Sequence, residues 1–252
     1  MDFMIPLLNI IELLLFIYLA FAAIYIFIFA FAAKFRNQKS FSKSKDKRKF
    51  AVLIPGYKED SVIIDVAKDA LKQDYPDDKY EIIIIADSFQ RKTLETLREL
   101  PINLLEVSFE KSTKAKALNK AMETIGDNYD IALILDADNI MEKSFLQKVN
   151  DAFSKKFIAI QAHRTAKNIN TSLAILDAIS EEINNSIFRK GHRSLGLSSA
   201  LIGSGMAFDY KYFKHVMSNI NAVGGFDKEL ELKLLQNKQK IEYLDNAIVK
   251  DE

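Results

Sequence analysis

Two aspartates one residue apart, Asp136 and Asp138, are the side chains whose types and spacing point most directly to chemistry. They follow the apolar run 131–135, and the short length and Asp/Asn boundaries of that run predict a buried strand. Strand residues two apart point the same way, so we expect both carboxylates to project together where the strand ends. Converging carboxylates repel unless a proton or cation is present. We therefore expect Mg²⁺ or Mn²⁺, which bind carboxylate and phosphate oxygens. The alternative is that both aspartates cap a helix at 141–152 and bind nothing.

The elements that must position this pair form an alternating pattern from residue 50 onward. The pattern predicts strands at 50–54, 81–86 and 102–107, with helices at 61–73, 91–100 and 114–125. Beyond residue 152 we expect strands at 157–161, 200–208 and 241–249, helices at 172–189, 210–217 and 227–236, and a Gly-containing loop at 191–196. Alternating strands and helices predict an α/β fold with a mostly parallel sheet. Ligands of such sheets bind at the carboxyl ends of the strands, which is where the two aspartates fall.

Composition limits the classes of protein that the chain can belong to. A length of 252 residues suits one large domain or two small ones. The absence of cysteine excludes disulfides and thiolate metal sites. Charge is uneven, with a net −2 in residues 1–33, +7 in residues 34–49 and −4 in the remainder. A mildly acidic main domain argues against a nucleic acid polymer as a partner.

The uncharged stretch near the N-terminus indicates a membrane segment. Residues 13–33 carry no charge and as a helix would span about 31 Å, close to the thickness of a bilayer core. A secretory signal peptide is the alternative, but the residues before the apolar run lack positive charge and the run is too long. Basic residues beside a membrane span stay in the cytoplasm. We therefore expect a transmembrane helix within 1–33, a basic linker at 34–49 that can approach anionic lipid, and a domain at 50–252. This places the N-terminus outside the plasma (inner) membrane, in a single-pass topology, and the domain in the cytoplasm.

Several segments occur in an order that resembles a known family. They are Ile54-Pro55-Gly56-Tyr57-Lys58-Glu59, the strand-end Asp87, Lys114-Ala115-Lys116-Ala117-Leu118-Asn119, Asp136-Ala137-Asp138, Gly203-Ser204-Gly205, and Gly224-Gly225-Phe226-Asp227 before a helix rich in Glu and Leu. Together they resemble a family 2 glycosyltransferase, in particular the membrane-bound branch of cellulose, hyaluronan and poly-N-acetylglucosamine synthases. The resemblance covers residues 50–252 and implies the GT-A fold, a Rossmann-like, mostly parallel sheet flanked by helices, here preceded by one transmembrane helix.

The resemblance also implies a role for each matching residue. It assigns the nucleotide-sugar pocket to Pro55, Tyr57, Glu59, Asp87, Lys114, Asp136, Gly203, Ser204 and Gly205. Asp136 and Asp138 would hold the Mg²⁺ or Mn²⁺ ion with the diphosphate. The general base of the family is the Asp of a Glu-Asp pair that heads a helix. Here Asp227 takes that position and Phe226 replaces the Glu, while a register two residues later would make Glu229 the base.

The activity that the resemblance implies is an inverting glycosyl transfer. The donor would be a nucleotide-diphosphate sugar, with UDP the commonest nucleotide in such relatives, and the acceptor a glycan or a lipid-linked sugar at the cytoplasmic membrane face. General chemistry agrees with this expectation. A metal ion and Lys114 would offset the negative charge that develops on the leaving diphosphate. A carboxylate on the opposite face would take the proton from the acceptor hydroxyl.

Two alternatives remain at the level of sequence. Haloacid-dehalogenase-type phosphatases also carry a strand-end Asp-x-Asp, but they usually place it near the domain start and follow it with Thr, whereas Asn139 follows here. The other alternative is an inactive glycosyltransferase-like membrane scaffold of a polysaccharide synthase, which the replacement at Phe226 favours. Processive relatives also continue past the equivalent of Glu252 with a Gln-x-x-Arg-Trp segment and further membrane helices, so we expect the chain to be a fragment of a longer protein.

Overall fold

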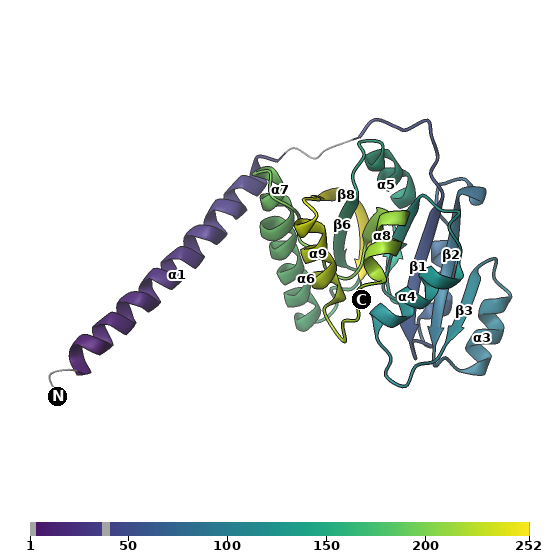
Figure 1. Cartoon of the computed structure of the whole chain (residues 1–252), viewed down its shortest axis with the longest axis horizontal. Helices are drawn as coiled ribbons and strands as arrows, with labels where there is room; N and C mark the ends of the chain where they lie inside the picture. The colour runs from purple at the N-terminus through teal and green to yellow at the C-terminus, as the bar shows by residue number, and fades with distance from the viewer. Residues whose placement is uncertain (1–3, 37–40, 252) are drawn as a thin grey trace.

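The computed structural model describes residues 4–36 and 41–251 (Figure 1). Residues 37–40 of the expected linker, the first three residues and Glu252 lie outside the described residues. The strands are β1 Phe50–Tyr57, β2 Tyr80–Asp87, β3 Asn103–Val107, β4 Ile131–Ile134, β5 Ile140–Met141, β6 Ala159–Ala166, β7 Met206–Asp209 and β8 Ile241–Asp251. The helices are α1 Met4–Lys34, α2 Ile63–Ala70, the 3₁₀ turn η1 Asp77–Lys79, α3 Arg91–Arg98, α4 Lys114–Thr124, α5 Phe145–Phe153, α6 Ser172–Asn184, the π-helix η2 Asn185–Gly191, α7 His192–Ser194, α8 Tyr210–Met217 and α9 Phe226–Gln236.

The strands form one mixed sheet in the order β3-β2-β1-β4-β7-β6-β8-β5. The β3-β2-β1-β4 half is parallel throughout, as the alternating pattern predicts. β7 runs antiparallel to both β4 and β6, and β5 runs antiparallel to β8. The chain moves outward from β1 to β3 and then returns to the other side of β1 as β4. Such a reversal of strand order opens a crevice at the carboxyl ends of the strands, here those of β1 and β4.

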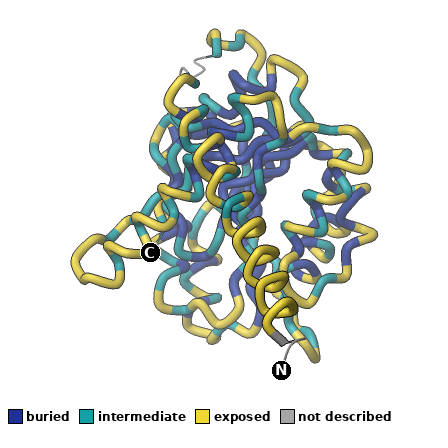
Figure 2. The backbone as a smooth tube through the Cα atoms, turned by 90° about the vertical axis from the view of Figure 1, so that its left-hand side faces the viewer, coloured by how far each residue is buried: buried dark blue, intermediate teal, exposed yellow. Residues whose placement is uncertain are grey.

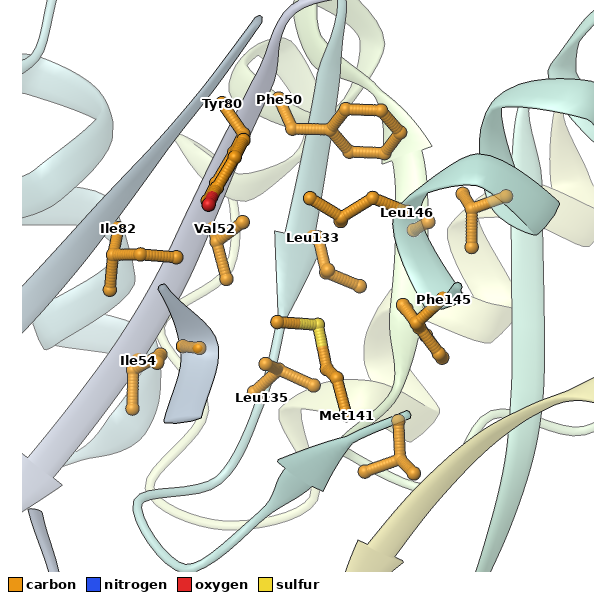
Figure 3. Close-up of a cluster of buried hydrophobic side chains, with 14 of the residues drawn as sticks. Phe50, Val52, Ile54, Tyr80, Ile82, Leu133, Leu135, Met141, Phe145 and Leu146 are labelled. Carbon is orange, nitrogen blue, oxygen red and sulfur yellow. The ribbon is translucent and has the colours of Figure 1, made fainter. Parts of the chain in front are cut away.

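Alternation of side chains along each strand divides the core into two layers. Phe50, Val52 and Ile54 on β1 point into one layer, together with Leu133 of β4 and Phe145 of α5 (Figure 3). The strand residues between them point into the second layer, where α4, α8 and α9 cover the sheet. Both faces of the parallel half are therefore buried, which is why its strands are almost continuously apolar in sequence.

Three predicted elements differ from the structure. The helix expected at 141–152 begins only at Phe145, because Met141 pairs with Val249 in the short strand β5. The strand expected at 200–208 is confined to β7, since Gly203 and Gly205 adopt positive φ angles that a strand does not allow. The loop expected at 191–196 is helical up to Ser194. The predicted helix 172–189 accordingly continues as α6, η2 and α7.

Helix α1 extends away from the domain, and most of its length is exposed (Figures 1 and 2). It is long and apolar enough to cross a membrane. Its carboxyl end contacts η2 and α7, where the backbone of Phe29 lies against Gly191 and the Tyr25 hydroxyl shares a 2.7 Å hydrogen bond with His192 Nε2. A side chain at position 191 would place its Cβ 2.3 Å from the Phe29 carbonyl oxygen, so glycine is what permits this approach.

Candidate active site

The carboxyl ends of β1 and β2 and the beginning of α4 enclose a pocket of about 160 Å³. Its lining residues are Pro55, Gly56, Tyr57, Asp87, Ser112, Thr113, Lys114 and Ala117. Immediately after the two strands, Lys58 and Ser88 both adopt left-handed backbone angles, with φ of 58° and 61°. Non-glycine residues rarely adopt this conformation, and in native structures it concentrates at functional sites. The sharp turns leave Tyr57 and Asp87 at the pocket wall.

Lys114 connects this pocket to the Asp-x-Asp segment. Its ammonium group forms an ion pair with Asp136 and donates a 2.8 Å hydrogen bond to the carbonyl oxygen of Gly203. Thr113 caps α4 by accepting a hydrogen bond from the Lys116 amide. The cap fixes Lys114 at the first turn of the helix, with its side chain directed towards the ends of β1 and β4.

The two aspartates lie in a turn after β4 rather than on the strand. β4 ends at Ile134, and the turn closes when the Asn139 amide donates to the Asp136 carbonyl oxygen at 3.2 Å. Strand alternation therefore does not bring the carboxylates together, contrary to the reasoning from sequence. Besides burial, the negative charges of Asp138 and Asp136 raise the pKa of the Asp251 carboxyl group.

Asn139 is the buried centre of a hydrogen-bond network that holds the turn. Its side-chain amide group donates to Asp138 Oδ1 at 3.0 Å and to Asp251 Oδ1 at 2.8 Å. Its side-chain oxygen accepts a hydrogen bond from the Ser204 hydroxyl, which in turn accepts one from the Asp136 amide at 3.0 Å. The network ties the turn to β8 and to the 203–205 loop. Asn139 is not among the site residues predicted from the sequence, although its place directly after the Asp-x-Asp pair is a signal.

Asp251 connects the turn to a row of charged groups on β6 and α6. Its carboxylate lies 3.2 Å from Arg164, which lies at the same distance from Glu181. Glu181 also pairs with the buried Arg189 at 3.0 Å. Burial raises the pKa of Asp251, while Arg164 opposes this effect. These residues were missed from the sequence because they come from four separate elements.

The two candidate bases occupy different environments. The Asp227 carboxyl lies 4.0 Å from the position that a Cβ atom on Gly203 would take, and the carbonyl oxygen of the same glycine accepts the hydrogen bond from Lys114. Phe226 is buried, with its ring centroid 5.5 Å from the Lys114 ammonium nitrogen. Glu229 instead lies 3.6 Å from Lys233, one turn along α9. The geometry brings Asp227 to the cluster around Lys114 and leaves Glu229 with a partner on its own helix.

The structure thus brings together most of the predicted site. Pro55, Tyr57, Asp87 and Lys114 share the pocket. Asp136 and Gly203 contact Lys114, and Ser204 bonds the Asp-x-Asp turn. Ser204 is fully buried, so its side chain supports the turn rather than lining an open surface. Glu59 is exposed outside the pocket lining, and its carbonyl oxygen accepts hydrogen bonds from the first amides of α2.

The Asp-x-Asp turn can hold a divalent ion only together with other ligands. Within residues 4–36 and 41–251, no cluster of three or more His, Cys, Asp or Glu side chains has the arrangement of a metal site. Two carboxylates completed by phosphate oxygens nevertheless fit the way proteins bind Mg²⁺. Asp136, which is about one-third exposed, and Asp138, which is held in place by Asn139, are the residues that would supply these two carboxylates.

Comparison with protein families assigns the chain. Residues 47–252 match a model described as glycosyltransferase like family 2. The chain belongs to this family. The phosphatase alternative is thereby excluded. The comparison with curated proteins found no match to this chain.

Solved structures with a similar fold support the GT-A assignment of this glycosyltransferase-like chain. The mannosyltransferase PcManGT from Pyrobaculum calidifontis, in complex with GDP-Man and Mn²⁺, superposes with a TM-score of 0.65 at 16% identity, over 90% of this chain and 64% of that chain. S. aureus TarS 1–349 in complex with UDP-GlcNAc gives a TM-score of 0.57 at 16% identity, over 80% of this chain and 57% of that one. The chain therefore spans less than two-thirds of either protein, and the likeness concerns the fold.

Proposed function

We propose that this chain transfers a sugar from a nucleotide-diphosphate sugar to an acceptor hydroxyl, with inversion at the anomeric carbon. One observation carries the proposal. The Asp227 carboxyl and the Lys114–Asp136 ion pair both adjoin Gly203, Asp227 near the position that a Cβ atom would take and Lys114 through a hydrogen bond to the Gly203 carbonyl oxygen. A reaction that removes a proton from an acceptor and develops negative charge on a leaving group uses a carboxylate and a cation placed near one another.

The pocket between β1, β2 and α4 suits the nucleotide. Tyr57 offers an exposed ring to a base, and Asp87 offers a carboxylate to a ribose or base donor group. The amino-terminal end of α4 lies in the same pocket, and helix amino ends favour phosphate. UDP is our proposed nucleotide, and GDP is the alternative because PcManGT was solved with GDP-Man.

Asp136 and Asp138 would hold Mg²⁺ or Mn²⁺ against the diphosphate. Such an ion, when bound, stabilises negative charge on the leaving oxygens. Lys114 would stabilise the same negative charge on the leaving oxygens. Its ammonium group is balanced by Asp136 in this structure and lies at the end of the nucleotide pocket, where a phosphate could share it.

Asp227 is the proposed general base. As the acceptor oxygen forms its bond to the anomeric carbon, the bond from that carbon to the diphosphate oxygen breaks, and the hydroxyl proton passes to the Asp227 carboxylate. Attack opposite the leaving group inverts the configuration. Phe226 stands where the family has Glu, and its side chain is buried. The next residue, Asp227, lies beside Gly203, so the proposed base is kept although the Glu is absent.

The same observation bears on the scaffold alternative. An inactive relative is expected to have lost its base or its cation site. Asp227, Asp136 and Asp138 are all present and adjoin one another through Lys114 and Asn139. No contact of the described residues favours a scaffold over an enzyme.

Helix α1 is our proposed membrane anchor, with its N-terminus outside and the domain, residues 50–252, on the cytoplasmic face. Its apolar surface is open to its surroundings, and the basic stretch that follows favours the cytoplasmic side. A glycan or a lipid-linked sugar at that face is the proposed acceptor, and the membrane-bound polysaccharide synthases remain the proposed branch.

Calorimetric titration of the full chain in detergent tests the nucleotide and the cation together. We expect UDP to bind more tightly with Mn²⁺ than without it, and Asp138→Ala to lose the increase while retaining the native melting temperature within a few degrees. GDP, titrated in parallel, identifies the nucleotide. Absence of binding by either nucleotide in the native chain would contradict the proposed function.

A second experiment tests the base. Asp227→Asn should abolish sugar transfer from labelled donor to membrane lipid or glycan while nucleotide affinity stays within about twofold, because a base acts in the transition state rather than in binding. Glu229→Gln is the matched control on the same helix and should retain activity. The reverse result would move the base to Glu229.

A further inference from the structure

Helix α6 carries its apolar residues on the outside of the protein. Leu173 is 73% exposed, Leu176 62%, and Ile179 and Ile183 are each 51% exposed. No residue of α6 is buried. The spacing of these residues places them on one side of the helix, since positions three and four apart share a face. A surface helix of a soluble protein normally packs its apolar face against the core and exposes its polar face.

Ion pairs hold α6 in this orientation. Glu181 points inward, where it meets Arg164 at 3.2 Å and Arg189 at 3.0 Å. Glu182 lies 2.7 Å from His163 on β6. Rotation of the helix to bury its leucines would break the inward pairs and leave Arg189, which is almost fully buried, without its carboxylate. The outward position of the apolar face is therefore fixed by the charges behind it.

The apolar face adjoins the surface from which α1 emerges. α6 continues into η2 and α7, and these two elements contact α1 through Gly191 and His192. Figure 1 shows α6 on the flank of the domain that faces α1, and Figure 2 shows α1 in front of that flank. Between them Phe188 approaches Tyr25, with ring centroids 6.5 Å apart. The exposed apolar surface thus continues from one helix to the other.

We propose that the outer face of α6 lies in the interfacial layer of the lipid bilayer that α1 crosses. The proposal rests on α1 as membrane anchor and does not depend on the transfer reaction. A helix with one strongly apolar face binds in this layer with that face about 5–10 Å deep, at the boundary between headgroups and acyl chains. Lipid is the occupant that the structure favours, because the α6 face is continuous with an apolar helix that itself needs lipid.

This placement would bring the site to the membrane surface. Asp177 and Glu181 of α6 line a pocket of about 330 Å³ together with Arg164 and Asp251, which joins the Asp-x-Asp turn through Asn139. A helix with its side chains is about 10–12 Å across. The pocket then lies about one helix diameter from the lipid, a position that suits an acceptor carried by a lipid.

The absence of tryptophan from the chain allows a direct test. Three single-tryptophan variants of the full chain are reconstituted into phosphatidylcholine vesicles whose acyl chains are brominated at a shallow or a deep carbon. Leu176→Trp reports on α6, and Phe21→Trp reports on the middle of α1, where the native side chain is 69% exposed. Lys92→Trp on α3, at the opposite end of the domain in Figure 1, is the control for water.

We expect shallow bromine to quench the fluorescence of Leu176→Trp most strongly and deep bromine to quench that of Phe21→Trp most strongly. Neither bromine position should quench Lys92→Trp. Suppose that bromine quenches Phe21→Trp, whereas Leu176→Trp emits as in water and is quenched by aqueous iodide. The α6 proposal is then wrong, and the proposal that α1 is the membrane anchor is retained. A Leu176→Trp signal shielded from both bromine and iodide would mean that a second protein surface covers α6. Loss of quenching at Phe21→Trp would overturn the anchor itself. Ile183→Trp on the same face repeats the measurement if Leu176→Trp does not fold.

Discussion

Asn139 is a buried side chain that connects three parts of the site. It bonds Asp138, Asp251 and Ser204, which belong to the Asp-x-Asp turn, to β8 and to the 203–205 loop. A buried amide with all its partners in place orders the groups around it, and its removal leaves those partners unsatisfied. The position of the Asp138 carboxylate therefore depends on a residue that has no charge of its own.

Replacement of this amide should affect both stability and ligand binding. We expect Asn139→Ala to lower the free energy of unfolding by about 1–3 kcal/mol, since buried polar partners lose their hydrogen bonds. Mn²⁺-dependent UDP binding should weaken, because Asp138 is no longer oriented. Asn150→Ala is the matched control, as Asn150 is equally buried but bonds Arg48 and Asp46 away from the site. Native UDP affinity in Asn139→Ala would disprove the positioning role.

The contact between α1 and the η2–α7 segment is an element-scale feature that depends on one glycine. Gly191 lies inside a helix, where alanine is normally the more stable residue by about 1 kcal/mol. Here the added Cβ would meet the Phe29 carbonyl oxygen at 2.3 Å, and a backbone atom cannot move aside alone. Close packing thus reverses the intrinsic preference.

The sign of a Gly191→Ala substitution tests this contact. We expect the full chain in detergent to lose about 1–3 kcal/mol of stability, the usual cost of overpacking, measured by thermal or denaturant unfolding. Gly224→Ala is the control, because a Cβ at position 224 meets no atom within 4 Å. A stability gain in Gly191→Ala would show that α1 does not pack against η2.

At the scale of the whole molecule, one buried carboxylate joins the end of the long apolar helix α1 to the sheet. Glu242 at the start of β8 lies 2.6 Å from Arg36, just beyond α1, and 2.8 Å from Arg193, near the end of α7. Burial by itself would raise the pKa of Glu242, but hydrogen bonds from Arg193 and Arg36 outweigh burial and lower the pKa from 4.5 to about 2. The folded state therefore strongly favours the charged carboxylate.

This shift predicts a loss of stability in acid. Because the pKa of Glu242 is lower in the folded chain, its contribution is complete above the unfolded value of 4.5 and disappears as pH falls towards 2. The shift corresponds to roughly 3 kcal/mol. Unfolding of the full chain, measured from pH 7 to pH 2, should show this loss. Glu242→Gln should be less stable at pH 7 and should lose less stability on acidification; an unchanged slope would contradict the assignment.

Local sequence was sufficient for the parallel half of the fold. Apolar strands, intervening helices and the N-cap at Thr113 follow from patterns that span fewer than about fifteen residues, and burial on both faces makes those patterns strong. The long apolar helix is equally readable, because its length and composition are local properties. The family resemblance suggests Asp227 or Glu229 as the base, and the position of Asp227 beside Gly203 is the basis for proposing Asp227.

Tertiary structure alone decided the features that depend on distant partners. The inward turn of Glu181 requires Arg164 and Arg189, and helix α6 therefore exposes an apolar face that its sequence would place in a core. The sequence places Gly191 in a loop, whereas in the structure this glycine packs against α1. Asn139 and Asp251 are far apart in the chain, and their bond forms only because β8 returns beside the Asp-x-Asp turn. The sequence by itself determined the strands of the parallel half, the long apolar helix and the chemical groups available to the candidate site, since each depends on nearby residues. The arrangement of those groups depended on pairing between remote segments, which no local pattern encodes.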